Sequence, residues 1–171
     1  MRAGYFGKLP ERADFVARGL PESFLAPFDQ WLRSGMQGVS DRLGPEWNDG
    51  FAAAPPWFFT LSAGVAGPDA VAGVMLPSCD RSGREIPFIL AAHGAVSPRA
   101  ATLAAAAAGW LEQAGQVARD VVGGTLPLVR FDSALGRLGV PKWPAELSPS
   151  AGAGPGWRLD GAGHLALALP R

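Results

Sequence analysis

Two short apolar runs, residues 71–76 and 86–92, constrain the fold of this chain more than any other feature of its sequence. Apolar runs of this length, bounded by Pro and Gly, are typical of buried strands. Residues 57–61 form a third run, which is rich in side chains that favour strands. Because the connections between these three runs are short, we expect successive strands to pair antiparallel.

Apolar residues at helical spacing predict helices before and after these strands. The first helix is expected to have Ser23 as its N-cap and to end before Gly44, and it tolerates Pro27 only in its first turn. Further helices are expected around Trp47 and Phe51, from Ser97 to Gly123, and around Phe131 and Leu138.

The two ends of the chain differ in their expected structure. Residues 4–10 are expected to form a short strand that leads into a turn. Residues 141–156 are rich in Pro, Gly, Ala and Ser and predict a loop, and residues 157–169 predict a closing hairpin. A length of 171 residues suits one domain, so we expect a single domain over residues 1–171.

The composition of the chain argues against several classes of protein. Its 15 basic and 15 acidic residues balance, which disfavours extended contact with nucleic acid. A single cysteine rules out a disulfide framework within the chain. Neither a signal peptide nor an apolar stretch long enough to cross a membrane is visible, so we expect a cytoplasmic protein without membrane insertion.

The segment between the second and third strands, residues 77–87, concentrates hydroxyl groups, the only thiol, two acids and two arginines. Loops held by a rigid scaffold are a frequent location of binding and chemistry. The simplest interpretation of this segment is a tight connection between strands, in which Asp80 accepts hydrogen bonds from backbone amides.

Two interpretations of Arg84 remain open. In one, Arg84 forms a pocket with Ser78 and Lys8 that holds an acidic group of a partner, because a guanidinium binds carboxylate or phosphate well. In the other, which we favour, Arg84 pairs within the chain with Asp80 or Asp14, because buried charges require partners.

The sequence does not indicate a catalytic or metal site. Cys79 as a nucleophile needs a histidine base, and the chain has only His93 and His164. Ser78 lacks the flanking glycines of a nucleophile elbow. The two histidines and the cysteine show no metal-ligand spacing. From these residues we expect no catalytic residues, no cofactor and no metal.

Two sequence motifs, read together, are more specific than either one alone. They are GYFGKLP at residues 4–10, followed by DF at 14–15, and PSCDRSGR at residues 77–84, followed by PF at 87–88. In these motifs the chain resembles the TagF family, also called ImpM, of accessory proteins of the bacterial type VI secretion system. The resemblance is best over residues 4–93.

The resemblance implies an α/β fold, a three-layer α-β-α sandwich with a mainly antiparallel sheet, similar to longin and profilin folds. It also implies a non-enzymatic protein that represses type VI secretion after translation, through contacts with regulatory proteins that include an FHA-domain scaffold. The alternatives are a structural scaffold subunit of the same apparatus, and a phosphate- or acid-binding enzyme that uses residues 78–84. The residues that the motifs carry over as a recognition or structural cluster are Lys8, Asp14, Ser78, Asp80 and Arg84.

Overall fold

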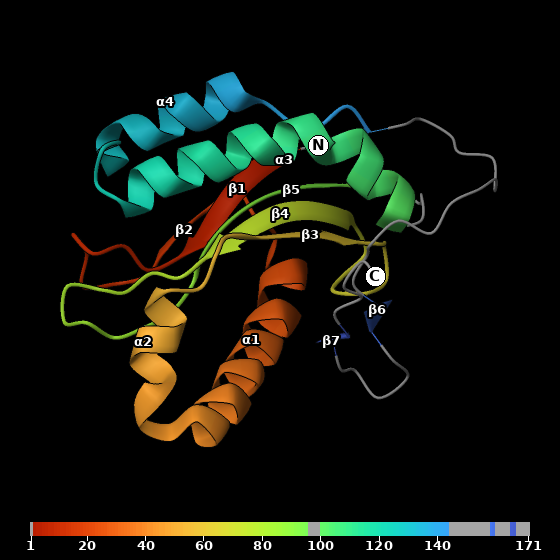
Figure 1. The fold of residues 1–171 in the computed structure, drawn as a ribbon. Helices are drawn as coiled ribbons and strands as arrows, with labels where there is room; N and C mark the ends of the chain where they lie inside the picture. The colour runs from red at the N-terminus through yellow and green to blue at the C-terminus, as the bar shows by residue number, and fades with distance from the viewer. Residues whose placement is uncertain (1, 96–99, 144–157, 160–164, 167–171) are drawn as a thin grey trace.

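The central element of the fold is an open five-stranded sheet in which all neighbouring strands are antiparallel (Figure 1). The computed structural model of the protein describes residues 2–95, 100–143, 158–159 and 165–166. The strands of the sheet lie in the order β2-β1-β5-β4-β3. Their bounds are β1 Arg2–Gly7, β2 Val16–Arg18, β3 Trp57–Leu61, β4 Ala70–Leu76 and β5 Phe88–Gly94.

The three apolar runs of the sequence form the adjacent strands β3, β4 and β5, which confirms the predicted antiparallel pairing. In this register Phe59 lies opposite Gly73, which lies opposite Ala91. The glycine is needed because a Cβ atom at position 73 would lie 2.6 Å from Cζ of Phe59 and 2.8 Å from Cβ of Ala91. Strand β5 begins two residues later than expected, at Phe88, because Pro87 has no N–H to donate to the sheet.

Strand β2 is not foreseen by the sequence pattern. It has three residues, lies at one edge of the sheet, and follows the charged segment 11–14, which has no alternation of apolar and polar side chains. The chain that leaves β2 passes very close to β1, because a Cβ atom at Gly4 would lie 2.3 Å from the carbonyl oxygen of Arg18. The absence of a side chain at Gly4 therefore makes room for this edge of the sheet.

Helices lie on both sides of the sheet (Figure 1). The helices expected from the sequence are present, although the start expected for the third one falls at residues 96–99, outside the described residues. Their bounds are α1 Glu22–Leu43, the 3-10 helix η1 Gly44–Glu46, α2 Trp47–Ala52, α3 Ala100–Val122 and α4 Leu128–Leu138.

The prediction that Ser23 caps α1 is wrong. The helix begins one residue earlier, at Glu22, and its N-cap is Pro21, whose ring favours the extended backbone that an N-cap requires. Pro27 lies in the second turn instead of the first, and its missing N–H leaves the carbonyl of Ser23 without its helical donor. Gly67 packs directly on this carbonyl, since a Cβ atom at Gly67 would lie 2.6 Å from the Ser23 oxygen.

The sheet separates two apolar clusters. On one face, Phe28 of α1 stacks on Phe59 of β3, with ring centroids 5.4 Å apart. On the other face, α3 and α4 cover the sheet, and Phe131 of α4 lies 4.7 Å from the ring of Tyr5 and 5.8 Å from that of Phe88. Burial of these large side chains on both faces is the main source of stability that the described residues offer.

The C-terminal part of the chain is described only in short pieces. Most of the predicted loop 141–156 lies outside the described residues, as does most of the predicted hairpin 157–169. Within that hairpin, β6 Arg158–Leu159 pairs antiparallel with β7 Leu165–Ala166. Among the helices that the structure describes, none is both long enough and apolar enough to span a membrane.

Candidate functional site

The sheet order brings the two sequence motifs together. Strand β1 ends beside the start of β5, and β4 ends beside the same residues, where Leu76 lies opposite Phe88. The chain after β1 and the loop 77–87 therefore meet at one end of the central strands of the sheet. The approach is close, because a Cβ atom at Gly7 would lie 2.4 Å from the carbonyl oxygen of Pro87, and the φ angle of Gly7 is 140°.

The loop 77–87 folds as a tight hairpin-like turn. Cys79 and Glu85 form an isolated antiparallel bridge, which continues the pairing of β4 and β5 beyond the strand ends. At the tip, the backbone N–H of Gly83 donates to the carbonyl of Asp80 at 2.9 Å, and the N–H of Asp80 donates to the carbonyl of Arg84 at 3.1 Å. Gly83 adopts a φ of 80°, which side-chain-bearing residues rarely adopt.

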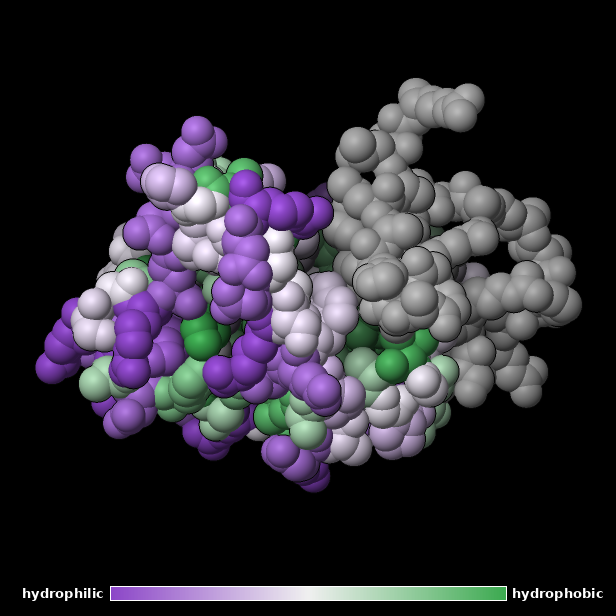
Figure 2. All heavy atoms as spheres, turned by 90° about the horizontal axis from the view of Figure 1, so that it is seen from below, coloured by the Kyte–Doolittle hydropathy of each residue, from purple (hydrophilic) through white to green (hydrophobic). Residues whose placement is uncertain are grey.

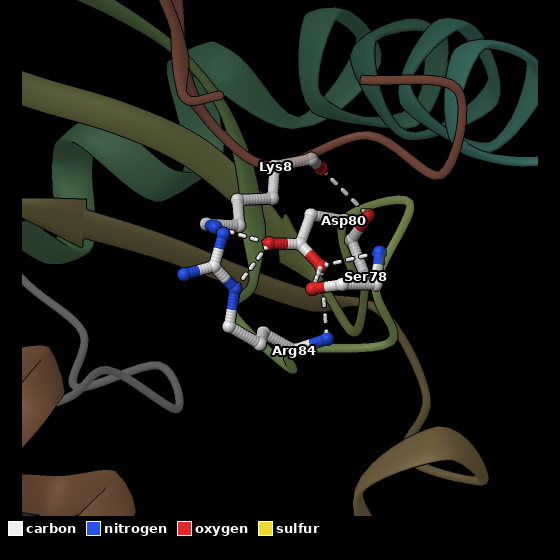
Figure 3. A network of polar contacts seen from close by, with 5 residues as sticks. Lys8, Ser78, Asp80 and Arg84 are labelled. Atoms are coloured by element: carbon white, nitrogen blue, oxygen red, sulfur yellow. Dashed lines mark hydrogen bonds and ion pairs between the residues drawn. The ribbon is translucent and has the colours of Figure 1, made fainter. Parts of the chain in front are cut away.

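The carboxylate of Asp80 lies inside this turn and accepts hydrogen bonds from five donors (Figure 3). Its Oδ1 accepts from the N–H and the hydroxyl of Ser82, at 2.9 and 2.7 Å, and from the N–H of Arg84 at 3.0 Å. Its Oδ2 accepts from Nε of Arg84 at 2.7 Å and from Nζ of Lys8. Asp80 therefore accepts hydrogen bonds from backbone amides of the turn, as predicted, and it also forms an ion pair with Lys8, which directly follows β1.

The ion pair of Lys8 and Asp80 is buried, with side chains that are 5% and 0% exposed. The Lys8 ammonium, followed by the Ser82 hydroxyl, holds the pKa of the Asp80 carboxyl far below its ordinary value, although burial alone would raise it. The Arg84 side chain, in contrast, is 68% exposed. Asp80 is therefore a fixed negative charge, neutralised from the inside by Lys8, and Arg84 lies on the outside.

Further contacts bind the two motifs to each other. The hydroxyl of Ser78 donates to the carbonyl of Lys8 at 2.7 Å and is buried. The N–H of Arg81 donates to the carbonyl of Arg12 at 2.9 Å, and Nη2 of Arg81 donates to the carbonyl of Glu11 at 2.9 Å. Because these bonds involve backbone groups of both segments, they fix the position of the turn relative to β1.

The structure brings together four of the five residues predicted as a cluster, and Asp14 is not among them. Asp14 is exposed and makes no hydrogen bond or ion pair with any residue that the structure describes. Of the two partners considered for Arg84, Asp80 is the one observed. Ser82 is not among the predicted residues, although an aspartate side chain in a turn often accepts a hydrogen bond from the backbone N–H two residues later, as Asp80 does from Ser82.

The described residues do not assemble a nucleophile with a base. His93 lies in the far part of β5, where its register partner is Arg2 at the start of β1, whereas Cys79 follows the C-terminal end of β4. Its ring nitrogens lie 2.6 Å from Oδ2 of Asp69 and 3.2 Å from the carbonyl oxygen of Gly19. His164 lies outside the described residues. Within the described part of the chain, no group of three or more His, Cys, Asp or Glu residues is placed to hold a metal.

Comparisons with known proteins agree with this arrangement of motifs. The family model of the TagF N-terminal domain, described as type VI secretion system-associated, matches residues 4–138. The crystal structure of PA0076 from Pseudomonas aeruginosa PAO1 is similar, with 37% sequence identity and a TM-score of 0.76 over 81% of this chain. The alignment covers 63% of PA0076, which is less than two thirds of that protein. None of the curated proteins matches the sequence. The chain therefore belongs to the TagF N-terminal domain family, which is associated with the type VI secretion system.

Proposed function

We propose that the chain is a non-enzymatic accessory protein that represses a bacterial type VI secretion system after translation, by contacting other proteins of that system. The family to which it belongs supports the association with type VI secretion. The observation that carries the mode of action is the turn at residues 80–84. Its internal charge is satisfied by Lys8, whereas the guanidinium of Arg84 faces outward.

A contact surface on a rigid turn has a physical advantage. The Asp80 hydrogen bonds fix the backbone of residues 82–84 before any partner arrives. A preordered loop loses less conformational entropy on binding, so more of the contact energy appears as affinity. Arg84 uses Nε for Asp80, and its exposed terminal nitrogens are suited to a carboxylate or phosphate of a partner.

The geometry supports a binding role better than the enzyme alternative that uses residues 78–84. The Asp80 carboxylate is held ionised by its donors, which is unsuitable for a group that has to exchange a proton. The hydroxyl of Ser78 donates to the carbonyl of Lys8, and no hydrogen bond within the described part of the chain joins this hydroxyl to a histidine or a carboxylate. Lys8 and Ser78 face inward, so they are not placed to form the pocket with Arg84 that was considered from the sequence.

The proposed partners of the chain are regulatory proteins of the secretion system, including an FHA-domain scaffold. The proposed location of the chain is the cytoplasm. We also propose that residues 1–171 form one domain with a three-layer α-β-α architecture similar to longin and profilin folds. The presence of helices against both faces of the antiparallel sheet supports this architecture.

The test is a secretion assay in a bacterium that uses this system and lacks its own copy of the gene. Complementation with the native chain should repress secretion, and Arg84→Glu should release that repression. The matched control is Arg130→Glu, which makes the same charge change at an exposed arginine of α4. Thermal melting of both variants shows that they are folded.

Each alternative has its own outcome in this assay. If secretion is lost when the gene is deleted, the chain is a scaffold subunit of the apparatus and not a repressor. If the double variant Ser78→Ala, Cys79→Ala abolishes regulation while the protein stays folded, the result supports the alternative of a phosphate- or acid-binding enzyme that uses residues 78–84. If Arg84→Glu represses as well as Arg130→Glu, the turn is not the contact surface.

A further inference from the structure

His93 is the only histidine that the structure describes, and it connects two loops to the sheet. It lies in β5 on the face that α1 covers, because Ile89 and Ala91, four and two residues before it, belong to the apolar cluster of that face. Its Nδ1 lies 2.6 Å from Oδ2 of Asp69, in the loop before β4. Its Nε2 lies 3.2 Å from the carbonyl oxygen of Gly19, between β2 and α1.

Both groups that face the ring of His93 are hydrogen-bond acceptors. An ionised carboxylate and a carbonyl oxygen have no proton to donate, so both hydrogen bonds require an N–H group of the ring. A neutral imidazole has only one N–H, and its second nitrogen would then turn a lone pair toward an oxygen. A protonated imidazole donates from both nitrogens. The two contacts therefore favour the protonated ring, whose side chain is 14% exposed, next to an Asp69 side chain that is 23% exposed.

The Asp69 carboxylate is the charge in direct contact with His93, and it favours the protonated ring. On the neighbouring strands, the register partner on β1 is Arg2, which is exposed, and the partner on β4 is uncharged. Arg18, which precedes the loop to α1, pairs with a carboxylate of α4. The charged residue in the first turn of α1 is Glu22, which is exposed. Exposed charges, which Figure 2 shows in number on the side of α1, are screened by water and act weakly on the ring.

The two acceptors belong to segments that adjoin the start of α1. Gly19 lies in the short connection from β2 to this helix. The loop that carries Asp69 touches the first turn of the same helix, since a Cβ atom at Gly67 would lie 2.6 Å from the carbonyl oxygen of Ser23. His93 therefore ties the loop 62–69 and the start of α1 to a central strand of the sheet.

We infer that protonated His93 is a pH-sensitive clasp that holds the loop 62–69 and the start of α1 on the sheet. When the pH rises and the ring loses a proton, one of its two hydrogen bonds is lost and these segments are held less tightly. The two acceptors face the ring only in the folded chain, so folding favours the protonated form. The stabilisation is therefore complete below about pH 6 and decreases as the pH rises beyond about 6.5, the ordinary pKa of a histidine.

The first test compares the native chain with His93→Gln by urea denaturation at pH 5.5 and at pH 8.5. Glutamine keeps a polar side chain at this position but does not titrate. We expect the native chain to have the higher denaturation midpoint at pH 5.5, and the difference to shrink to less than half at pH 8.5. His164→Gln, at the other histidine of the chain, is the matched control and should have the same effect at both pH values. A difference for His93→Gln that does not change with pH overturns the inference.

The second test observes the ring itself by NMR, so it does not depend on the folding of His93→Gln. In the His164→Gln variant, the titrating ring signals belong to His93 alone. We expect the ring to be protonated in more than half of the molecules at pH 6.5, and Asp69→Asn to lower that fraction. The backbone amide signals of Gly19 and Gly67 should shift over the same pH range as the ring. A neutral ring at pH 6, or amide signals that do not follow the ring, contradicts the clasp.

The clasp is separate from the turn at residues 80–84 and does not depend on the proposed function. The denaturation and NMR measurements need only the purified chain, whereas the secretion assay tests Arg84→Glu in a bacterium. Failure of the clasp and failure of the proposed function are therefore distinguishable.

Discussion

Lys8 and Asp80 form a buried ion pair although 72 residues of sequence separate them. The pair joins the end of β1 to the turn between β4 and β5. Both charges are nearly inaccessible to water, so each depends on the other for compensation. The turn, and the surface that it presents, are therefore tied to β1 through this pair.

Lys8→Met should strongly destabilise the fold, because it removes the buried cation that faces the Asp80 carboxylate. We expect the free energy of unfolding to fall by about 3 kcal/mol, measured by urea denaturation. Lys142→Met is the matched control, because Lys142 is exposed, and it should change the free energy by less than about 0.5 kcal/mol. Equal denaturation midpoints for the two variants would show that the ion pair does not contribute to stability.

Arg84→Ala should have a much smaller effect on stability than Lys8→Met. The Arg84 side chain is 68% exposed, and Asp80 keeps its bonds to Lys8 and Ser82 when the guanidinium is removed. We expect the free energy of unfolding to fall by no more than about 1 kcal/mol. A loss as large as that of Lys8→Met would contradict the assignment of Arg84 to the outside of the turn.

The stability of the chain should depend on Asp80 at acid pH. Its pKa is lower in the folded state than in the unfolded state, where it is about 3.9, so protons bind preferentially to the unfolded chain at low pH. The stabilisation from Asp80 is therefore complete above about pH 5 and decreases as the pH falls below about 4.

Urea denaturation between pH 6 and pH 3 measures this effect through the difference between the native chain and Asp80→Asn. We expect the difference to shrink toward pH 3, because the native carboxylate loses its advantage there. Asp14→Asn provides the comparison for an exposed aspartate without an ion pair among the described residues. A difference that stays constant over this range would mean that the Asp80 charge makes no contribution.

Gly73→Ala should destabilise the centre of the sheet. The added methyl group would lie 2.6 Å from Cζ of Phe59 and 2.8 Å from Cβ of Ala91, so it overpacks the α1 side of the core. We expect a loss of about 1–3 kcal/mol in thermal or urea unfolding. Gly35→Ala is the control, because a Cβ atom there has open space, and in a helix it should stabilise by up to about 1 kcal/mol.

The parts of the fold that the sequence predicted are those that depend on local pattern. The apolar runs identified β3, β4 and β5, and Asp80 beside Gly83 identified a turn. Strand β2 was missed because its three residues owe their conformation to pairing with β1 and not to their own side chains. The cap at Ser23 was wrong because Pro21 already sets the backbone before α1.

In the candidate site, too, the contacts predicted from the sequence are those between residues that lie close together in the chain. The sequence placed Ser78, Asp80 and Arg84 in one segment, so their proximity followed from the chain itself. The ion pair of Lys8 with Asp80 depends on the position of β1 next to β5, which is a property of the sheet order. Asp14 lies only six residues after Lys8, but its side chain is exposed, so closeness in sequence to Lys8 did not place it in the cluster.

The distance in sequence between Lys8 and Asp80 has a consequence for biosynthesis. Lys8 leaves the ribosome 72 residues before Asp80, an interval of about 4–14 s at 5–20 residues per second. During this interval β1 also lacks its neighbour β5, which ends at Gly94. Strand β2 is available to pair with one side of β1 soon after β1 is made, but the backbone groups on the other side of β1 have no strand to pair with until β5 has been synthesised.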